Sequence, residues 1–243
     1  MLSLYKKEIA GFFSSLTGYL VIIIFLLATS LFMWVFPGEL NILDAGYSSI
    51  EPLFIIAPWI FLFLVPAITM RMFAEERKSG TLELLFSRPV SDFGIVLSKY
   101  LASLTLVLFS LIPCMVYYFS VYFLGNPVGN IDAGGTWGSF AGLFFLAALY
   151  AAIGIFASGV SENIIVSFVL SLALCFFFLS GIDSIAHIPA FSSISTFILN
   201  LGINEHYQSM SRGVIDSRDL IYFLAMVAIF LVVTKTLLNS RKW

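Results

Sequence analysis

Charged residues are scarce in this chain, and several long stretches contain none. Only 11% of the 243 residues are Asp, Glu, Lys or Arg, whereas 60% are hydrophobic. A soluble domain averages about a quarter charged residues. A water-soluble fold of this length cannot bury so much apolar surface, so lipid must be the solvent for most of the chain.

Other absences narrow the function. The 12 Lys and Arg do not outnumber the 14 Asp and Glu, so the basic surplus typical of nucleic-acid binding is missing. The two cysteines, Cys114 and Cys175, lie in apolar runs, which favours packing over a disulfide framework or a zinc site. His187 and His206 have no metal-binding spacing and are expected at a surface or interface.

Motifs for catalysis or nucleotide binding are also missing. The Gly-Lys dipeptide of a phosphate-binding Walker A loop does not occur, and neither does the Gly-x-Ser-x-Gly turn of a serine hydrolase. We therefore expect no catalytic residue, no metal and no cofactor on this chain, so its energy source must lie elsewhere.

Six apolar runs are long enough to cross a membrane as helices, since a crossing needs roughly 20 residues. The sequence predicts a single all-α, polytopic transmembrane domain over residues 1–243. The expected spans are 16–36, 52–70, 100–124, 137–160, 164–182 and 220–239.

The basic residues predict the orientation, because Lys and Arg concentrate on the cytoplasmic side. An even number of spans puts both termini on one side. With both termini inside, the outer segments hold only Arg212 and Arg218. The inner segments then hold ten basic residues: Lys6, Lys7, Arg71, Arg77, Lys78, Arg88, Lys99, Lys235, Arg241 and Lys242. This bias indicates cytoplasmic termini, and a bacterial inner (plasma) membrane is the simplest location.

Two segments outside the spans have helical patterns. In residues 1–15, apolar side chains recur at helical spacing, which predicts an amphipathic helix in the inner membrane interface. A simple membrane anchor is the alternative. In the outer segment 183–219, apolar residues recur at spacings of three and four within 188–203. That length is too short for a crossing, so we expect a re-entrant or interfacial helix before the last span.

Charge is concentrated in one inner loop, "MRMFAEERKSGTLELLFSRP", residues 70–89. Gly80 permits a sharp turn, Thr81 can cap a new helix, and Glu83 lies in its first turn. Leu82, Leu84, Leu85 and Phe86 supply apolar side chains to that helix. The acidic residues mixed among the bases add nothing to a positive-inside signal, so residues 75–88 are interpreted as a docking segment for a cytoplasmic partner. An ordinary charged loop is the alternative.

The same segment closely resembles the coupling segment of ABC-2-type permeases, the membrane subunits of a class of ABC transporters. The resemblance covers the whole chain. Residues 152–168 and 211–223 are most similar to the permease subunit of the gliding-motility-associated ABC transporter of Bacteroidetes. The residues that match the coupling pattern are Arg71, Phe73, Ala74, Glu75, Glu76, Arg77, Gly80, Thr81, Glu83, Leu84, Leu85, Pro89 and Val90.

The resemblance implies a mechanism and partners. A separate cytoplasmic ATPase subunit would bind ATP and magnesium, and a second permease, either another copy or a sister chain, would complete the complex. A buried Glu–Arg pair often couples the layers in such families, and the turn at Glu162 would make a second, smaller contact. A periplasmic partner is also implied as an option. The residues expected to dock the ATPase are Arg71, Glu75, Glu76, Arg77, Lys78, Gly80, Thr81, Glu83, Leu84, Leu85, Glu162 and Asn163.

Two other function classes compete with this one. A stand-alone carrier or channel driven by an ion gradient normally needs an ionisable residue inside the membrane, and the expected spans have none at mid-depth. An intramembrane enzyme would need a nucleophile–base or metal constellation. The cargo stays open: a lipid, an apolar molecule, a polypeptide segment, or none, with the work done on a periplasmic partner.

Overall fold

The computed structural model describes residues 1–86 and 91–240, apart from the side chains of Thr17, Leu84 and Phe86. Every regular element in this part of the chain is a helix. The bounds are α1 Leu2–Phe13, α2 Leu16–Ser30, η1 Leu31–Val35, α3 Ile42–Ala45, α4 Glu51–Thr69, α5 Ala74–Lys78, α6 Leu82–Phe86, α7 Asp92–Leu111, η2 Ile112–Cys114, α8 Met115–Leu124, α9 Ala133–Val160, α10 Ile164–Phe176, η3 Phe177–Gly181, α11 Ile182–Ala186, η4 Pro189–Ile194, α12 Ser195–Leu199, α13 Ile203–Ser211 and α14 Ser217–Ser240.

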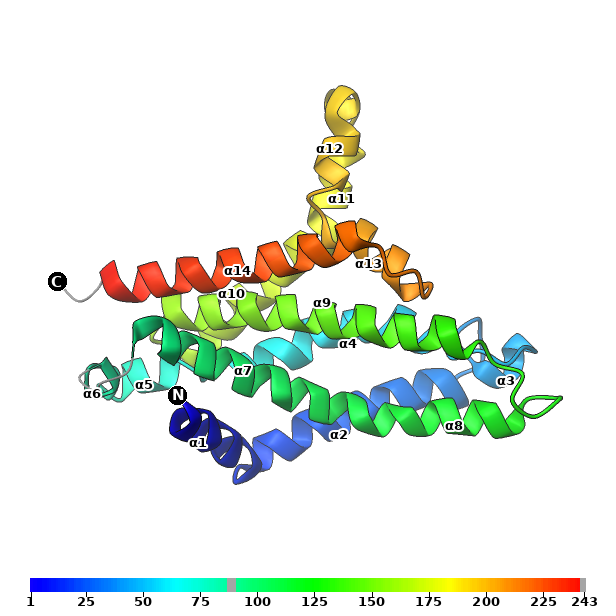
Figure 1. Cartoon of the computed structure of the whole chain (residues 1–243), viewed down its shortest axis with the longest axis horizontal. Helices are drawn as coiled ribbons and strands as arrows, with labels where there is room; N and C mark the ends of the chain where they lie inside the picture. The colour runs from blue at the N-terminus through cyan, green and yellow to red at the C-terminus, as the bar shows by residue number, and fades with distance from the viewer. Residues whose placement is uncertain (87–90, 241–243) are drawn as a thin grey trace.

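Among the described residues, six helical stretches are long and apolar enough to cross a membrane, which confirms the predicted class of all-α, multi-pass membrane protein. They are Gly18–Val35, Glu51–Lys78, Asp92–Leu124, Ala133–Val160, Ile164–Ala186 and Ser217–Ser240. The spans run along one long axis (Figure 1). The start of α1, the end of α14, α5, α6 and the α9–α10 turn lie at one end, here called the terminal end. The α3 segment and the α8–α9 loop lie at the opposite, far end.

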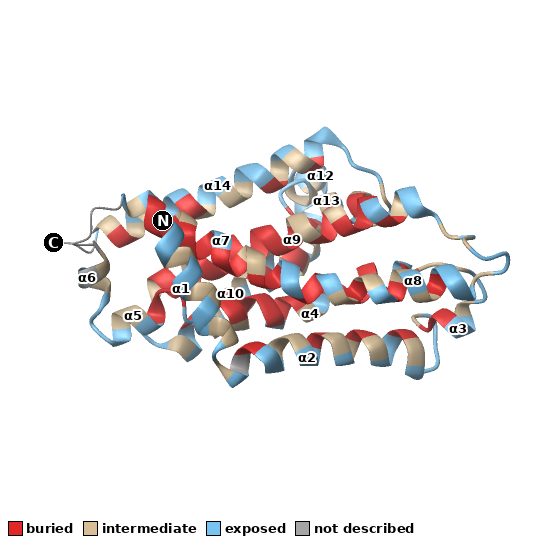
Figure 2. Ribbon diagram, turned by 60° about the horizontal axis from the view of Figure 1, so that its bottom comes forward, coloured by how far each residue is buried: buried red, intermediate tan, exposed pale blue. Residues whose placement is uncertain are grey.

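Helix α9 is the centre of the bundle. It contacts α4, α7, α10, α13 and α14, and buried positions run along most of its length (Figure 2). Its apolar, small-residue composition permits this, because small side chains let neighbouring helices approach closely. At Gly154 an added Cβ would clash with the Thr69 side chain of α4, so the two helices touch there through the glycine.

Four of the six spans contain a π-turn, internal prolines or a 3₁₀ turn, and two do not. The first ends in the π-turn η1 and the fifth passes through the π-turn η3, while α4 contains Pro58 and Pro66. The third changes to the 3₁₀ turn η2 at Pro113, where proline cannot donate a helix hydrogen bond. Helices α9 and α14 run without a break, and they contact each other extensively.

The N-terminal helix α1 differs from the expected membrane-surface helix in what its apolar face contacts. Leu4, Ile9, Phe12 and Phe13 pack against the core of the bundle, and α1 lies along α7. The Tyr5 hydroxyl lies 3.0 Å from Thr105 Oγ1 of α7. The helix is therefore part of the bundle's terminal end, and its apolar stripe serves protein packing.

The segment before the last span also differs from expectation. The predicted single helix over 188–203 is two shorter pieces, η4 and α12, which fold back along α11. We call residues 182–199 the lateral hairpin, because they leave the bundle sideways between its two ends (Figure 1). Its first helix, α11, is also the last part of the apolar stretch Ile164–Ala186. A further helix, α13, follows the hairpin. Its Ile203, Tyr207 and Met210 are buried against the bundle, a four-then-three spacing that was present in the sequence and missed.

Candidate docking site at the terminal end

The predicted coupling segment forms two short helices joined by a sharp turn. Helix α4 ends at Thr69, α5 follows after one turn of chain, and α6 begins at Leu82. Gly80 between them has a φ of 68°, a left-handed conformation that favours glycine. The Thr81 hydroxyl donates to the Glu76 carbonyl oxygen at 3.3 Å and lies 2.8 Å from Ser79 Oγ. These bonds hold the start of α6 against the end of α5.

Two leucines of α6 fix the helix on its own bundle. Leu82 and Leu85 are partly buried and pack against the core of this chain. Glu83 is exposed between them. The Leu84 side chain and residues 87–88 lie outside the described part of the chain. The helix is thus set on the bundle by its own apolar side chains and presents a charged one.

One serine connects α5 to the central helix. Ser158 of α9 is fully buried, and its hydroxyl oxygen accepts hydrogen bonds from the backbone N–H of Phe73 (2.9 Å) and of Ala74 (3.1 Å). The same hydroxyl donates to the Met70 carbonyl oxygen at 3.0 Å. The chain between α4 and α5 has left its helical pattern here, so its polar backbone groups need other partners. Ser158 supplies them and attaches the coupling segment to α9.

A buried lysine connects the same segment to two further helices. Lys99 Nζ of α7 lies 2.7 Å from Glu8 Oε1 of α1 and 3.0 Å from Glu76 Oε2 of α5, and its side chain is only 1% exposed. Lys7 Nζ lies 3.1 Å from the other oxygen of Glu76. The Lys99 ammonium group also lies 5.2 Å from the centroid of the Phe73 ring. The carboxylate of Glu76 therefore joins α1, α5 and α7.

In this ion cluster, Glu76 forms ion pairs with Lys7 and Lys99. Arg77 donates from Nη1 to the Val160 carbonyl oxygen, at 3.4 Å, at the end of α9. Glu8 and Lys99 were not predicted as site residues. Their signal is weak in sequence, because Glu8 and Lys99 are 91 residues apart.

The two predicted contact elements meet in one groove. A cavity of about 640 Å³ lies between α5 and the α9–α10 turn, with Arg71 and Lys78 on one side and Glu162 and Asn163 on the other. Its apolar wall is Met70, Ile164, Ile165 and Phe168. Asn163 also begins α10, since its Oδ1 accepts a hydrogen bond from the Ile165 N–H at 2.9 Å. The groove thus combines both charge signs with apolar surface at the terminal end.

A second cavity, of about 600 Å³, separates α1 from α4 and α5. Glu75, Ser79 and Thr81 line it from the coupling segment, and Phe12 and Val21 line it from the N-terminal helices. The ion cluster forms part of its wall. Of the predicted residues, the structure therefore brings ten into or beside these two cavities and the joints around them: Arg71, Glu75, Glu76, Arg77, Lys78, Gly80, Thr81, Leu85, Glu162 and Asn163.

The remaining titratable groups lie elsewhere. Cys114 and Cys175 are buried and unpaired, as the packing interpretation predicts. Within the described residues, no cluster of His, Cys, Asp and Glu has the arrangement of a metal site.

At the far end, His206 Nδ1 lies 2.7 Å from Asp219 Oδ1 and its ring stacks on Tyr222, with centroids 3.9 Å apart. Burial raises the pKa of the neighbouring Tyr207 phenol, whose hydroxyl donates to the Phe54 carbonyl oxygen.

Fold and site together define a multi-pass membrane protein. Its charged α5–α6 segment and its α9–α10 turn lie together at one end of the bundle. Comparison with protein families adds the finer assignment. Residues 44–234 match the ABC-2 family transporter protein, so the chain belongs to this family. The match includes the coupling segment, the α9–α10 turn and most of the last span. No relative among curated proteins matches this chain.

Proposed function

We propose that this chain is the permease subunit of an ABC transporter and that separate ATPase subunits dock at its terminal end, in the cytoplasm. The chain does no chemistry itself, and ATP and magnesium belong to the partner. The observation that carries the proposal is the groove in which α5 and the α9–α10 turn meet, because docking needs charges to fix register and apolar surface to bury.

The joints behind the groove explain how movement of a docked ATPase reaches the membrane. Ser158 ties the start of α5 to α9, and Glu76 ties α5 to α1 and α7 through two lysines. A displacement of α5 therefore acts on three helices at once. ATP-driven closure of the ATPase pair would shift these helices together and change which side of the membrane is open.

A second permease is part of this proposal. The spans Gly18–Val35, Ile164–Ala186 and Ser217–Ser240 bury only 22%, 22% and 17% of their most apolar stretch inside the chain, whereas Ala133–Val160 buries 78%. Such surface suits lipid and a second permease, either another copy or a sister chain. The similarity of residues 152–168 and 211–223 to a gliding-motility permease makes gliding motility the process we propose, in a bacterial inner membrane.

The experiment is retention of the ATPase by the purified, tagged permease. Lys78→Glu and Glu162→Lys each reverse one charge in the groove, and Asp44→Lys is the matched reversal at the far end. We expect each groove variant to weaken binding about tenfold or more, which corresponds to about 1.4 kcal/mol, and the Asp44 variant to leave it unchanged. Unchanged binding in both groove variants would contradict docking at this site.

A further inference from the structure

The lateral hairpin has a composition unlike that of an arm in water. The 21 residues 184–204 contain no Asp, Glu, Lys or Arg. Neither η4 nor α12 has a buried residue, and Phe197 is 68% and Ile194 52% exposed. Large apolar side chains exposed together mark an interaction surface. Part of what surrounds this hairpin must therefore be apolar.

The hairpin leaves the bundle at membrane depth. The helix that leads to it runs from Ile164 at the terminal end to Gly181, and 18 residues of helix span at most about 27 Å. The hydrocarbon layer is about 30 Å thick. Helix α9, with 28 residues, extends about 42 Å and so passes well beyond that level. The hairpin thus begins near the far boundary of the hydrocarbon layer and not at the tip of the bundle.

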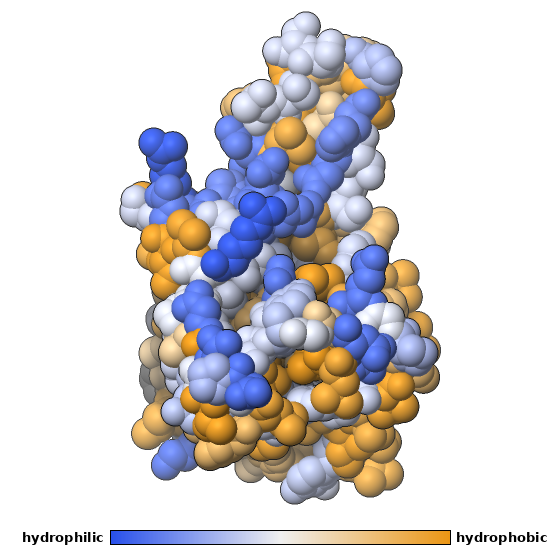
Figure 3. Space-filling view, turned by 90° about the vertical axis from the view of Figure 1, so that its right-hand side faces the viewer, coloured by the Kyte–Doolittle hydropathy of each residue, from blue (hydrophilic) through white to orange (hydrophobic). Residues whose placement is uncertain are grey.

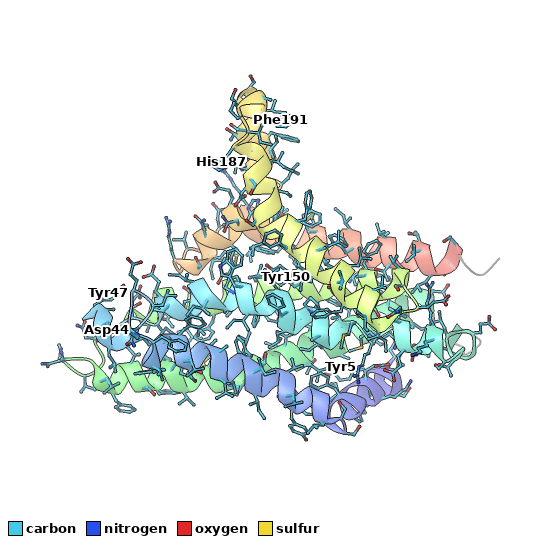
Figure 4. The ribbon with its side chains drawn as sticks, turned by 180° about the vertical axis from the view of Figure 1, so that it is seen from behind. Tyr5, Asp44, Tyr47, Tyr150, His187 and Phe191 are labelled. Atoms are coloured by element: carbon cyan, nitrogen blue, oxygen red, sulfur yellow. The ribbon has the colours of Figure 1, made fainter. Side chains whose placement is uncertain are left out.

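Its direction agrees with this depth. The hairpin stands at a steep angle to the spans in Figures 1 and 4, so it lies close to the membrane plane. Figure 4 shows His187 on the side of the far end and Phe191 on the opposite side. In Figure 3, which faces the far end, hydrophilic side chains gather over the end of the bundle and the hairpin rises past its edge. A polar side toward water and an apolar side toward lipid follow from this placement.

Three polar side chains of the hairpin bond to backbone carbonyl oxygens within it or just before it. Ser184 Oγ donates to the Ser180 carbonyl oxygen at 2.9 Å, and Ser195 Oγ donates to that of Ser192 at 3.1 Å. His187 Nδ1 lies 2.7 Å from the Asp183 carbonyl oxygen. Polar groups in or near hydrocarbon need such internal partners. The large apolar side chains Phe191, Ile194 and Phe197 are exposed on the hairpin, and at this depth lipid can cover them.

We propose that the lateral hairpin is a membrane-surface arm that inserts its apolar side into the far-side leaflet of the bilayer. The insertion is hydrophobic, since residues 184–204 carry no charge with which to select a headgroup, and Asp183 lies at the base of the arm. It therefore takes zwitterionic and anionic lipids equally. Where the arm joins the bundle, Asn204 donates to Asp183 Oδ2 at 2.6 Å and Tyr222 donates to the Leu201 carbonyl oxygen at 2.7 Å. These bonds transmit any shift of α14 to the embedded arm.

Spin-label accessibility in vesicles tests this proposal directly. The full chain, with Cys114 and Cys175 changed to Ala, carries one label at Phe197→Cys, at Leu224→Cys as the span control, or at Val214→Cys as the loop control. Each of these three side chains is well exposed. We expect the label at 197 to collide with oxygen more than with a water-soluble nickel chelate, with a ratio like that at 224 and severalfold above that at 214. The ratio should be the same in phosphatidylcholine and in its mixture with phosphatidylglycerol.

Two other outcomes would overturn the proposal. A label at 197 that the nickel chelate reaches as easily as at 214 places the arm in water. A label that neither reagent reaches places it under a second protein. An independent variant guards against effects of the label: with the label at Phe191→Cys, Ile194→Asp should raise nickel accessibility severalfold, because a charge is expelled from lipid. No change in that variant would also count against lipid insertion.

Discussion

Lys99 is almost fully removed from solvent, and its charge is balanced by two carboxylates from different helices. Replacing a buried ion cluster with apolar residues is often neutral, whereas removing one member leaves uncompensated charge. Here the unpaired members would be Glu8 and Glu76, which would be left close together. The cluster therefore makes the packing of α1 and α5 on α7 depend on a single side chain.

Lys99→Met should lower the free energy of unfolding by about 3–5 kcal/mol, because it leaves buried carboxylates without a cation. The thermal unfolding midpoint of the purified chain in detergent measures this loss. Lys7→Met is the control, since the Lys7 side chain is 66% exposed and such pairs contribute about 0–1 kcal/mol. The triple variant Lys99→Met, Glu8→Gln, Glu76→Gln should recover most of the loss. A Lys99→Met protein as stable as the Lys7 control would show that the cluster does not stabilise the joint.

Ser158→Ala should loosen the start of α5, because the N–H groups of Phe73 and Ala74 lose their acceptor. Leaving such groups unsatisfied costs about 1–3 kcal/mol. We expect faster hydrogen exchange in residues 70–78 and a lower thermal midpoint. Ser103→Ala is the matched control, as Ser103 is equally buried but bonds only to the Tyr100 carbonyl oxygen of its own helix. Equal exchange in both variants would rule out the proposed attachment.

At the scale of elements, the α5–α6 segment combines a rigid seat with an exposed charged edge. Leu82 and Leu85 fix α6 on the bundle, and the Gly80 turn sets the angle between the two helices. A partner that pushes on this edge cannot move α6 independently of the bundle. The segment can therefore pass on a displacement of the whole unit, provided that the turn keeps its left-handed backbone.

Gly80→Ala should strain that turn by about 1–2 kcal/mol, because a Cβ disfavours the left-handed conformation. An added Cβ meets nothing within 4 Å, so the effect is one of backbone conformation alone. Gly11→Ala is the control, since its space is equally open and its φ is not positive. We expect weaker retention of the ATPase in Gly80→Ala only. Equal retention in the two variants would show that the angle of the turn does not matter for docking.

The sequence was informative about the spans and much less so about their joints. An apolar run that is long enough to cross the hydrocarbon layer as a helix is expected to do so. The six spans therefore follow from the apolar runs alone. Lys99 was assigned to an inner loop because its partners are distant in sequence and only the fold brings them together. The helix α13 was missed because Asn204, Glu205 and His206 mask the apolar spacing of its buried face. The break between η4 and α12 has no Gly or Pro to mark it.

At the scale of the whole molecule, the two ends differ in what they offer a partner. The terminal end has the groove, the ion cluster, the start of α1 and the end of α14, and the far end has short loops, while the arm leaves the bundle between the two ends. From the bias of basic residues we propose that the terminal end faces the cytoplasm. Every functional statement about docking depends on this orientation.

A cysteine-labelling experiment in living cells tests the orientation. Ser79→Cys should stay unlabelled by a membrane-impermeant thiol reagent, whereas Tyr47→Cys, which replaces a side chain 59% exposed in the opposite loop, should be labelled. Cys114 and Cys175 are fully buried and give no background. Labelling at position 79 with none at 47 would invert the topology and remove the docking proposal.

The unbroken pair of α9 and α14 has a mechanical consequence for the complex. The other four spans contain π-turns, prolines or a 3₁₀ segment, where a helix bends most easily. Force entering through Ser158 therefore meets a stiff rod that spans the full thickness of the bilayer, with a second rod beside it. Such a rod tilts rather than shortens, so a small sideways step at one membrane face reappears as a sideways step at the other.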